Sequence, residues 1–490
     1  MAPRPNGQLN QSRALIQEPA IDMLILAERE RNQRDEERSN FVVAGLPEND
    51  GCTDTEKVVK LCEDHDLGAR LADTEILETV RIGSVLRAMK GMKASKALNP
   101  DGIPSFILKE VRDYVNLWQY FSKSRFEKCK FPTSWKLSHV TPIFKGKGKR
   151  SDPKNYRPIS LTSPFLKIME RVIVEKLNSH LELDNLISDH QHGFRKNRST
   201  VSQLVVIHEY IQSTLDRGIP IDIILIDLLK AFDRISLRKL IHCLEVHGVK
   251  KQLKDWLSAY TNDRKIAVKV AETLSTWTDA TSGVPQGSFL GPVLFVMYID
   301  ICINSISQTD FGLFADDTKL LGEASASSQS QSDLDTLREK LEEWQLSPNV
   351  AKCSVVHLGR QNPKYSYKMK GIDLTKSTCE KDLGVILSLD LKPEKHIGLV
   401  VRKASNTLWL LTHSLRYLDI HSKISAYTSY VRPQLEYATV IWSPYLKKDI
   451  DRIERVQKRF VKGLQGFRNL PFLPPNPKKG ACPQEPKIEA

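Results

Sequence analysis

The chain has few cysteines, and they are not spaced as metal or redox pairs. Its 490 residues contain 8 cysteines, and no two of them form a C-x-x-C pair. Zinc sites and small disulfide-stapled domains are read from such close or regular spacings. The sequence therefore indicates neither a zinc site nor a disulfide framework. Its cysteines fit a reducing compartment, the cytoplasm or the nucleus.

Long apolar runs are also absent. The longest lie around residues 223–226 and 293–299, whereas a helix that crosses a bilayer needs about 20 apolar residues. No apolar signal region follows the opening residues Met1-Ala-Pro-Arg4. We therefore expect a protein that has no membrane segment and is not secreted.

Acidic residues are scarce in most of the chain. Residues 1–83 hold 10 Lys and Arg against 17 Asp and Glu, whereas residues 84–490 hold 62 against 42, a net charge of +20. A basic surface of that size is typical of proteins that bind the phosphate backbone of nucleic acids. A generally basic soluble protein would show the same balance. The length leaves room for two or more domains with a sizeable core.

Two adjacent aspartates, Asp316 and Asp317, are the most informative feature of the chain. They follow the apolar run 311–313 and precede Thr318-Lys-Leu-Leu321, a pattern that predicts a hairpin with acids at its tip. Half-buried carboxylates repel each other unless a cation neutralises them, and Mg²⁺ is the usual cation where phosphates are substrates. A plain polar turn would have the same sequence, so the pair alone leaves both interpretations open.

A third acid, Asp227, follows a run of β-branched and apolar residues. Residues 221–228 have the pattern of a strand buried on both faces, and from Lys230 onward the apolar spacing becomes helical. A carboxylate at the end of such a strand is well placed to hold metal. Two Mg²⁺ ions roughly 3.5–4 Å apart, held by such acids, activate a 3′-hydroxyl and stabilise a leaving pyrophosphate. A strand-end acid followed by an Asp pair on a hairpin fits the palm of a polymerase.

Further motifs surround these acids in a fixed order. They are Asn99-Pro-Asp-Gly-Ile-Pro104, Trp135-Lys136, Val140-Thr-Pro-Ile-Phe-Lys145, Asn155-Tyr-Arg-Pro-Ile-Ser-Leu161, Gln191-His-Gly-Phe-Arg195 with Ser199-Thr200, Asp227-Leu-Leu-Lys-Ala-Phe-Asp233, Gly283-Val-Pro-Gln-Gly-Ser288 with Leu290-Gly-Pro292, Phe314-Ala-Asp-Asp317, Trp344-Gln-Leu346 with Asn349 and Lys352-Cys353, Leu383-Gly-Val385, Tyr430-Val-Arg-Pro433, Leu435-Glu-Tyr-Ala438 and Trp442-Ser-Pro444. In this order, the chain resembles the reverse transcriptases of jockey-like non-LTR retrotransposons.

The resemblance implies an α+β right-hand polymerase fold with fingers, a palm and a helical thumb. It implies RNA-templated DNA synthesis, with an RNA template, a DNA primer and deoxynucleoside triphosphates as partners. Asp227 and Asp316 correspond to the metal ligands, and Asp317 flanks and assists them. The implied cofactor is a pair of Mg²⁺ ions, for which Mn²⁺ can substitute. The sequence leaves the oligomeric state open.

The resemblance also suggests residues that contact the nucleotide phosphates. Arg157 is the better candidate, because a planar guanidinium suits bidentate phosphate contact. Lys145, on the basic loop Lys145-Gly-Lys-Gly-Lys-Arg150, is the weaker one. A plain structural role is the alternative for both residues. Lys352 is a candidate general acid that protonates the leaving pyrophosphate, although an exposed lysine is the commoner explanation.

Three more residues are expected to shape the nucleotide pocket. Phe232 corresponds to the bulky gate that crowds a ribose 2′-hydroxyl, whereas from sequence alone it is equally an aromatic core residue. Gln286 offers an amide to the nucleotide, and Gly287 allows close approach of the backbone. Asp233, which lies past the strand end, is expected to be a polar turn residue.

The predicted regions follow from these motifs. We expect disorder at 1–20, a coiled-coil and RNA-recognition-like fragment at 21–83, fingers and palm at 84–384 with a core at 124–384, a helical thumb at 385–466, and a disordered, truncated tail at 467–490. The 21–83 fragment resembles the RNA-binding protein from the first open reading frame of such elements. An ordinary α+β lead-in is its alternative. In the thumb, a helix over 447–465 is expected to place apolar residues on one stripe and cations elsewhere.

Several features favour a rival hypothesis, a catalytically inactive relic that only binds nucleic acid. The endonuclease that normally precedes this polymerase is not found upstream. Leu98-Asn99, Leu229, Phe289 and Pro348 depart from the usual spelling of their motifs. Phe289 replaces a smaller aliphatic residue, and Pro348 stands where an aromatic residue usually precedes Asn349. Both are expected to distort the nucleotide pocket, where extra volume in a packed site costs on the order of 1–3 kcal/mol.

Overall fold

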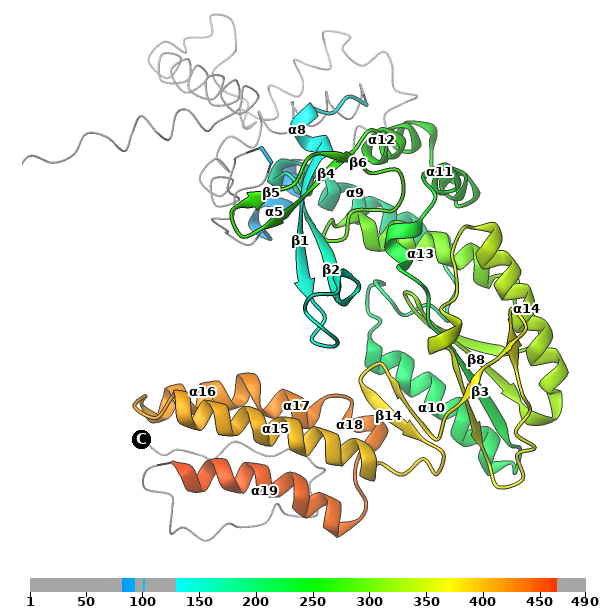
Figure 1. Ribbon diagram of the computed structural model, residues 1–490, viewed down its shortest axis with the longest axis vertical. Coiled ribbons are helices and arrows are strands. Elements are labelled where there is room, and N and C mark those ends of the chain that lie inside the picture. Colours follow the sequence, from blue (N-terminus) through cyan, green and yellow to red (C-terminus); the bar gives the residue numbers. More distant parts are fainter. Residues whose placement is uncertain (1–81, 93–99, 102–128, 465–490) are drawn as a thin grey trace, which may run out of the picture. The chain divides into compact units, whose positions relative to one another are not determined.

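The computed structural model describes residues 82–92, 100–101 and 129–464 (Figure 1). The regions predicted at 1–20 and 467–490 lie outside these residues. So does the 21–83 fragment apart from its last two residues, and with it the resemblance to a first-reading-frame protein. The described chain mixes helices and sheets, as expected for an α+β protein.

The chain divides into two compact units, each built from three stretches of sequence. Among the described residues, the first unit takes those up to Arg198, then Ile226–Thr318 and Ser332–Val350. The second takes Ser199–Leu225, Lys319–Gln331 and the described residues from Ala351 onward. Several elements therefore begin in one unit and end in the other.

The first unit holds most of the helices that precede the Asp316 turn. Its helices are α5 (Ile82–Lys90), α8 (Thr133–Lys136), α9 (Pro164–Leu183), α11 (Leu237–Val246), α12 (Lys251–Thr261) and α13 (Leu290–Ile303), with short 3-10 helices η4 (Pro153–Asn155) and η5 (Ala231–Arg234). Its strands are β1 (Leu137–Phe144), β2 (Tyr156–Leu161), β4 (Lys265–Val270), β5 (Thr273–Leu274), β6 (Thr278–Asp279) and β7 (Asp310–Phe314).

A sheet built on β1 and β2 carries the basic loop. The two strands pair antiparallel, and β1 also pairs parallel with β4, against which both β5 and β6 lie antiparallel. The residues between Phe144 and Tyr156 therefore form the loop of a hairpin, visible at the end of β1 and β2 in Figure 1. This confirms the predicted hairpin position of Lys145-Gly-Lys-Gly-Lys-Arg150.

Helix α13 is apolar apart from Asp300, and its residues are buried accordingly. From Leu290 to Ile303 nearly every residue is buried, as a helix without a polar face must be. The predicted buried helix after the Pro285-Gln-Gly turn is thus confirmed. The predicted helix after Lys230 is only partly right, because the 3-10 turn η5 comes first and the α-helix starts at Leu237.

The second unit contains the remaining elements. They are α10 (Thr200–Asp216), β3 (Ile221–Ile226), β8 (Asp317–Glu323), η6 (Ala324–Ala326), α14 (Ser327–Glu343), η7 (Val350–Lys352), β9 (Ser354–Leu358), β10 (Lys368–Met369), β11 (Ile372–Asp373), β12 (Thr375–Lys376), β13 (Cys379–Asp382), β14 (Val385–Ser388), α15 (Glu394–Ser414), α16 (Ile420–Tyr430), α17 (Arg432–Glu436), α18 (Thr439–Trp442) and α19 (Lys447–Gly463). Of these, β3, β8, α14 and η7 cross into the first unit.

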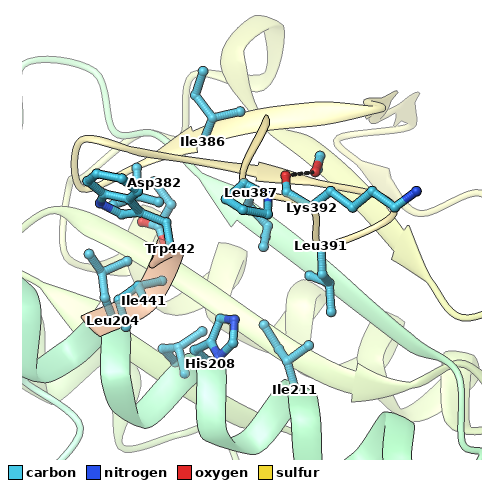
Figure 2. Close-up of a pocket in the computed structure, with 14 residues that line it drawn as sticks. Leu204, His208, Ile211, Asp382, Ile386, Leu387, Leu391, Lys392, Ile441 and Trp442 are labelled. Carbon is cyan, nitrogen blue, oxygen red and sulfur yellow. Dashed lines mark hydrogen bonds between the residues drawn. The ribbon is translucent and has the colours of Figure 1, made fainter. Parts of the chain in front are cut away.

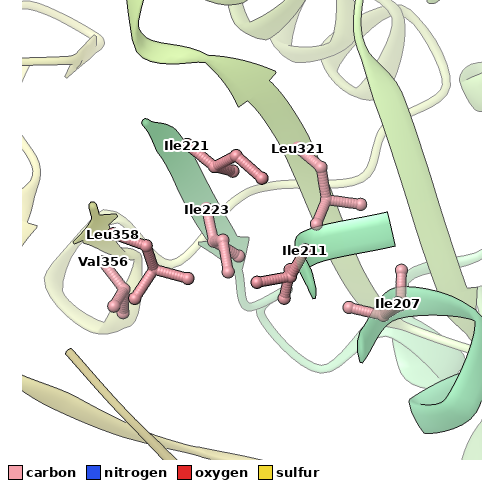
Figure 3. Packing of buried hydrophobic residues seen from close by; sticks show 7 residues of the cluster. All are labelled: Ile207, Ile211, Ile221, Ile223, Leu321, Val356 and Leu358. Carbon is pink, nitrogen blue, oxygen red and sulfur yellow. The ribbon is translucent and has the colours of Figure 1, made fainter. Parts of the chain in front are cut away.

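Strand β3 lies inside the sheet of this unit, in the order β12-β9-β3-β8. Its sequence, Ile-Asp-Ile-Ile-Leu-Ile, is β-branched at most positions, and five of its six residues are buried. Figure 3 shows one core cluster, in which side chains of α10, β3, β8 and β9 meet; its members are Ile207, Ile211, Ile221, Ile223, Leu321, Val356 and Leu358. This confirms the predicted buried strand, although it ends at Ile226 rather than Leu228.

One residue of β3 is a fully buried carboxylate, Asp222. It accepts hydrogen bonds from His357 Nδ1 at 2.6 Å, Asn362 Nδ2 at 2.8 Å and Tyr367 Oη at 2.8 Å. Buried charges persist only where such partners replace the lost water. Together with the apolar cluster, these bonds fix β3 along its length.

Helices α15 to α19 follow the β13–β14 hairpin. Helices α15 and α19 lie side by side (Figure 1), and between them is a second cluster that includes Ala404, Leu408, Tyr427, Val431 and Val456. The ring of Phe460 on α19 stacks on Tyr427 at 4.1 Å. The predicted helix over 447–465 is confirmed in place, although it ends at Gly463, and Ile453, Val456 and Phe460 of its apolar stripe pack into this cluster while Ile450 is exposed. No helix in the described ranges is long and apolar enough to cross a membrane.

The packing around β3 predicts a large stability effect for Ile223. This side chain is 1 % exposed, whereas Ile372 is 59 % exposed. Ile223→Ala should lower the free energy of unfolding of the unit that contains it by about 2–5 kcal/mol, and Ile372→Ala by less than about 0.5 kcal/mol. Urea denaturation followed by circular dichroism measures both. Equal losses in the two variants would contradict this packing.

Candidate active site

Asp227 lies directly after β3, where the chain enters the first unit. Its Oδ2 atom accepts a hydrogen bond from Asn349 Nδ2 at 2.9 Å, and its backbone oxygen accepts one from the Asn349 amide at 2.7 Å. Leu229 N donates to Ser347 O at 2.9 Å, and Leu228 pairs with Pro348. The segment 347–349 therefore runs along 227–229 and fixes the carboxylate. The sequence predicted no role for Asn349, because nothing in its motif shows which side chain it would contact.

Asp316 lies in the tight turn between β7 and β8. The residue before it, Ala315, is 4 % exposed and has φ +57°, a left-handed conformation that residues with a side chain seldom adopt. Asp316 is half-buried, and Asp317 is exposed at the first position of β8. The predicted hairpin tip is thus confirmed, with the two acids facing different surroundings.

The charge of Asp227 acts on the Asp316 carboxyl. Burial raises the pKa of the Asp316 carboxyl above its ordinary value, the nearby charge of Asp227 raises it further, and the guanidinium of Arg157 opposes both effects. Arg157 is exposed on β2. The structure therefore brings together three residues that lie far apart in the sequence. A divalent cation between the carboxylates would relieve the same repulsion that burial intensifies.

The donor set suits Mg²⁺ only when a substrate completes it. No group of three or more His, Cys, Asp or Glu side chains in the described part of the chain is arranged to hold a metal ion. Proteins commonly bind Mg²⁺ through one or two carboxylates together with substrate phosphates. The Asp227–Asp316 pair fits that pattern, whereas an all-protein cage would need more ligands.

Gln286 is bound to the turn after Asp227. Its Nε2 atom donates to Asp233 Oδ1 at 2.8 Å, and its backbone oxygen accepts from Ser160 N on β2 at 2.7 Å. Burial raises the pKa of Asp233, while the bond from Gln286 and the charges of Lys230 and Lys145 lower it. Lys145 thus lies within electrostatic reach of this carboxyl. Asp233, expected to be only a polar turn residue, holds the Gln286 amide.

Two glycines let this loop approach its neighbours. A Cβ atom on Gly283 would lie 2.8 Å from backbone atoms of Asp233, and one on Gly287 would lie 3.0 Å from Ser160 O. Both glycines also have positive φ, +81° and +109°, which side chains disfavour. Gly287 was expected to allow a close approach of the backbone, and in the structure that approach is to β2.

Phe232 packs against the core, and its role as a gate for the sugar stays a prediction. Its ring stacks on Phe295 of α13 with centroids 4.4 Å apart, and the ring of Phe194 meets it edge-on at 6.3 Å. It remains only half-buried. One face of the ring thus belongs to the core.

Lys352, the candidate general acid, ends the 3-10 helix η7 with an exposed side chain. It belongs to the second unit, whereas Asp227 and Asp316 belong to the first. Its role in proton transfer stays a prediction.

Phe289 and Pro348, which depart from the expected motifs, both contact neighbouring residues of the protein. The Phe289 amide donates to the buried Glu170 Oε2 at 2.7 Å, and the Arg171 guanidinium lies 4.3 Å from the centre of its ring. Pro348 is buried and pairs with Leu228. Phe289 thus packs beside Arg171, and Pro348 lies within the protein beside Leu228.

The second unit contains a pocket of a different character. Figure 2 shows it between α10, with Leu204, His208 and Ile211, and the β13–β14 hairpin, with Ile386 and Leu387; Trp442 closes one side. Its lining is largely apolar and includes none of the predicted site residues. The paired carboxylates therefore define a separate site.

Comparisons with known proteins agree on one family. Residues 145–396 match the family described as reverse transcriptase (RNA-dependent DNA polymerase). The chain is 27% identical over 420 residues to "Probable RNA-directed DNA polymerase from transposon BS" of Drosophila melanogaster, covering 79% of this chain and 45% of that protein. It is 25% identical over 352 residues to "RNA-directed DNA polymerase from mobile element jockey" of the same species, covering 69% and 38%. The chain thus spans less than half the length of these relatives.

The repulsion at Asp316 predicts a pH-dependent stability effect. A carboxyl whose pKa is raised on folding contributes stability below its unfolded pKa, and that contribution is lost as the pH rises through its folded pKa. Without added metal, Asp316→Asn should therefore melt higher than the wild type at pH 7.5, by roughly 2–4 °C, with a smaller difference at pH 4.5.

Differential scanning calorimetry at the two pH values measures the effect. Asp373→Asn, at an exposed position on β11, is the matched control and should show no pH-dependent difference. A gain for Asp316→Asn that is the same at both pH values would rule out electrostatic repulsion as its cause.

Proposed function

This chain belongs to the reverse transcriptase (RNA-dependent DNA polymerase) family, and on that premise we propose that it carries out RNA-templated DNA synthesis. Its substrates are an RNA template, a DNA primer and deoxynucleoside triphosphates. The reaction adds a deoxynucleoside monophosphate to the primer 3′-hydroxyl and releases pyrophosphate. The observation that carries the proposal is the placement of Asp227 directly after β3 and of Asp316 in the β7–β8 turn, where the charge of Asp227 raises the pKa of Asp316 and that of Arg157 lowers it.

Asp227 and Asp316 would hold the divalent metal, with Asp317 flanking them. Two Mg²⁺ ions, or Mn²⁺ in their place, supply activation of the hydroxyl and charge neutralisation at the phosphates when bound. Asn349 keeps Asp227 oriented through its side-chain bond at 2.9 Å. Lys352 donates a proton to the departing pyrophosphate.

The residues around the pair bind and select the nucleotide. Arg157 and Lys145 contact the triphosphate through charge. The bond from Gln286 Nε2 to Asp233 holds the Pro285-Gln-Gly loop on η5, and the bond from Ser160 N to Gln286 O holds it against β2, so that the loop forms a rigid side of the pocket. The accessible edge of Phe232 crowds a ribose 2′-hydroxyl, and its stacking on Phe295 keeps the ring from moving aside.

The proposal also assigns the parts of a right-hand polymerase. The β1–β2 hairpin and its helices serve as fingers, the segments with the three acids as the palm, and α15–α19 as the thumb. On α19, Lys448 pairs with Glu394 and Arg452 with Asp449, whereas Val456 and Phe460 face the cluster shared with α15. Arg455, Arg459 and Lys462 then supply positive charge for the template–primer backbone.

Loss of the Asp316 carboxylate should abolish the reaction. In an assay of the full chain on poly(rA)/oligo(dT) with Mg²⁺, Asp316→Ala should lower incorporation of dTMP by at least about 10²–10³-fold, because one of the two metal-binding carboxylates is gone. Asp373→Ala, at an exposed position, should keep wild-type incorporation. Both variants should retain RNA binding that weakens as salt rises.

The same assay distinguishes an active polymerase from an inactive relic that only binds nucleic acid. A well-folded wild-type chain that binds RNA in a salt-dependent way but incorporates nothing with Mg²⁺ or Mn²⁺ would establish the inactive relic and overturn the proposed activity.

Phe232 should control the choice of sugar. Phe232→Val opens space for a 2′-hydroxyl, so the ratio of kcat/KM for dTTP over UTP should fall by about 10- to 100-fold. Single-nucleotide primer extension measures this ratio. Phe131→Val, which removes a ring packed on Trp256 at 5.0 Å, is the control and should leave the ratio unchanged. An unchanged ratio in Phe232→Val would show that the ring is only a core residue.

A further inference from the structure

A buried glutamine contacts the turn that carries Asp316. Gln191 is fully buried, and its Oε1 atom accepts two backbone hydrogen bonds, from Gly193 N at 2.7 Å and from Ala315 N at 2.9 Å. Ala315 is the left-handed residue directly before Asp316. A single side-chain oxygen thus ties two loops together that lie more than a hundred positions apart in the sequence.

The two loops also pack backbone against backbone. Leu313 N donates to His190 O at 3.1 Å, and His192 N donates to Leu313 O at 2.9 Å. A Cβ atom on Gly193 would lie only 2.3 Å from Ala315 N, closer than any real contact permits. The segment 190–193 therefore lies along β7 and packs against the turn. Only glycine fits at position 193, where the two backbones come closest.

The choice of glutamine over glutamate has an electrostatic reason. Both contacts of Gln191 need an acceptor, which fixes the orientation of its amide and leaves the buried Nε2 atom without a hydrogen-bond partner among the described residues. An unpaired buried donor is unfavourable. A glutamate would accept both bonds without that penalty, but it would place a further negative charge beside the Asp227–Asp316 pair.

We propose that Gln191 is a positioning residue for the polymerase reaction, which fixes the Ala315 amide so that the turn presents the Asp316 carboxylate to Asp227 in one geometry. This inference rests on the proposed function in so far as Asp316 acts in catalysis. Gln191 itself does not touch substrate. Its loss should lower kcat and leave the KM for dTTP unchanged, because Arg157 and Gln286 lie on other segments.

The experiment compares Gln191→Met with Gln203→Met in the full chain. Methionine keeps the length of the side chain and removes the acceptor. Gln203 is also buried, at 1 % exposure, and its side-chain amide has no hydrogen-bond partner among the described residues. It therefore controls for loss of a buried side-chain amide. Gln191→Met should speed hydrogen exchange in the peptide 311–318 by at least about tenfold and lower kcat by about 10- to 100-fold. Gln203→Met should change neither.

A second pair of variants leaves the Gln191 side chain in place. One of them should displace the turn, and the other is its control. Gly193→Ala brings a methyl group against Ala315 N, whereas a Cβ on the exposed Gly83 would make only an ordinary contact, 3.5 Å from Arg87 Nη1. Gly193→Ala should reproduce the faster exchange and the loss of kcat, and Gly83→Ala should not.

Wild-type exchange in Gln191→Met overturns the inference, and so does faster exchange with an unchanged kcat. A wild-type chain that incorporates no nucleotide overturns the proposed function instead. The exchange rates of residues 311–318 then still decide whether Gln191 holds the turn.

Discussion

The proposed active site depends on holding two like charges close together where water is partly excluded. Burial and the neighbouring charge of Asp227 both make the Asp316 carboxyl harder to ionise. Left to themselves, such groups would separate or take up protons. The protein instead fixes each acid through the backbone segment that carries it, one directly after a strand and the other in a tight turn. The repulsion that results is what a divalent cation would relieve.

Close backbone contacts supply this rigidity. Segment 347–349 runs along Asp227, segment 190–193 lies against the Asp316 turn, and Gly283 lies against Asp233. At Gly193 and Gly283 a methyl group would meet backbone atoms within 2.3 Å and 2.8 Å. Closely packed backbone segments have few alternative arrangements, so they restrict the positions of the acids that they carry.

The strand before Asp227 is fixed by two kinds of interaction. On β3, isoleucines enter an apolar cluster with α10 and β9, while Asp222 is held by three hydrogen bonds. The apolar cluster supplies stability, and the buried polar network permits only one register, because a shifted strand would leave a carboxylate without partners. This arrangement fixes β3 and therefore the position of Asp227, which directly follows it.

The sequence by itself determined the elements whose residues leave little choice. The β-branched run of β3, the largely apolar α13, the hairpin around Lys145 and the amphipathic α19 were predictable because local pattern and burial agree. The ordered motifs also identified the family and the pair Asp227 and Asp316. Only the tertiary structure decided which residues support that pair. Asn349, Gln191 and the Asp233–Gln286 bond depend on contacts between distant segments, and hydrogen-bond partners of single polar residues leave no periodic pattern in a sequence. The interleaving of the two units has the same origin, because contacts across the fold, rather than positions along the chain, define a compact unit.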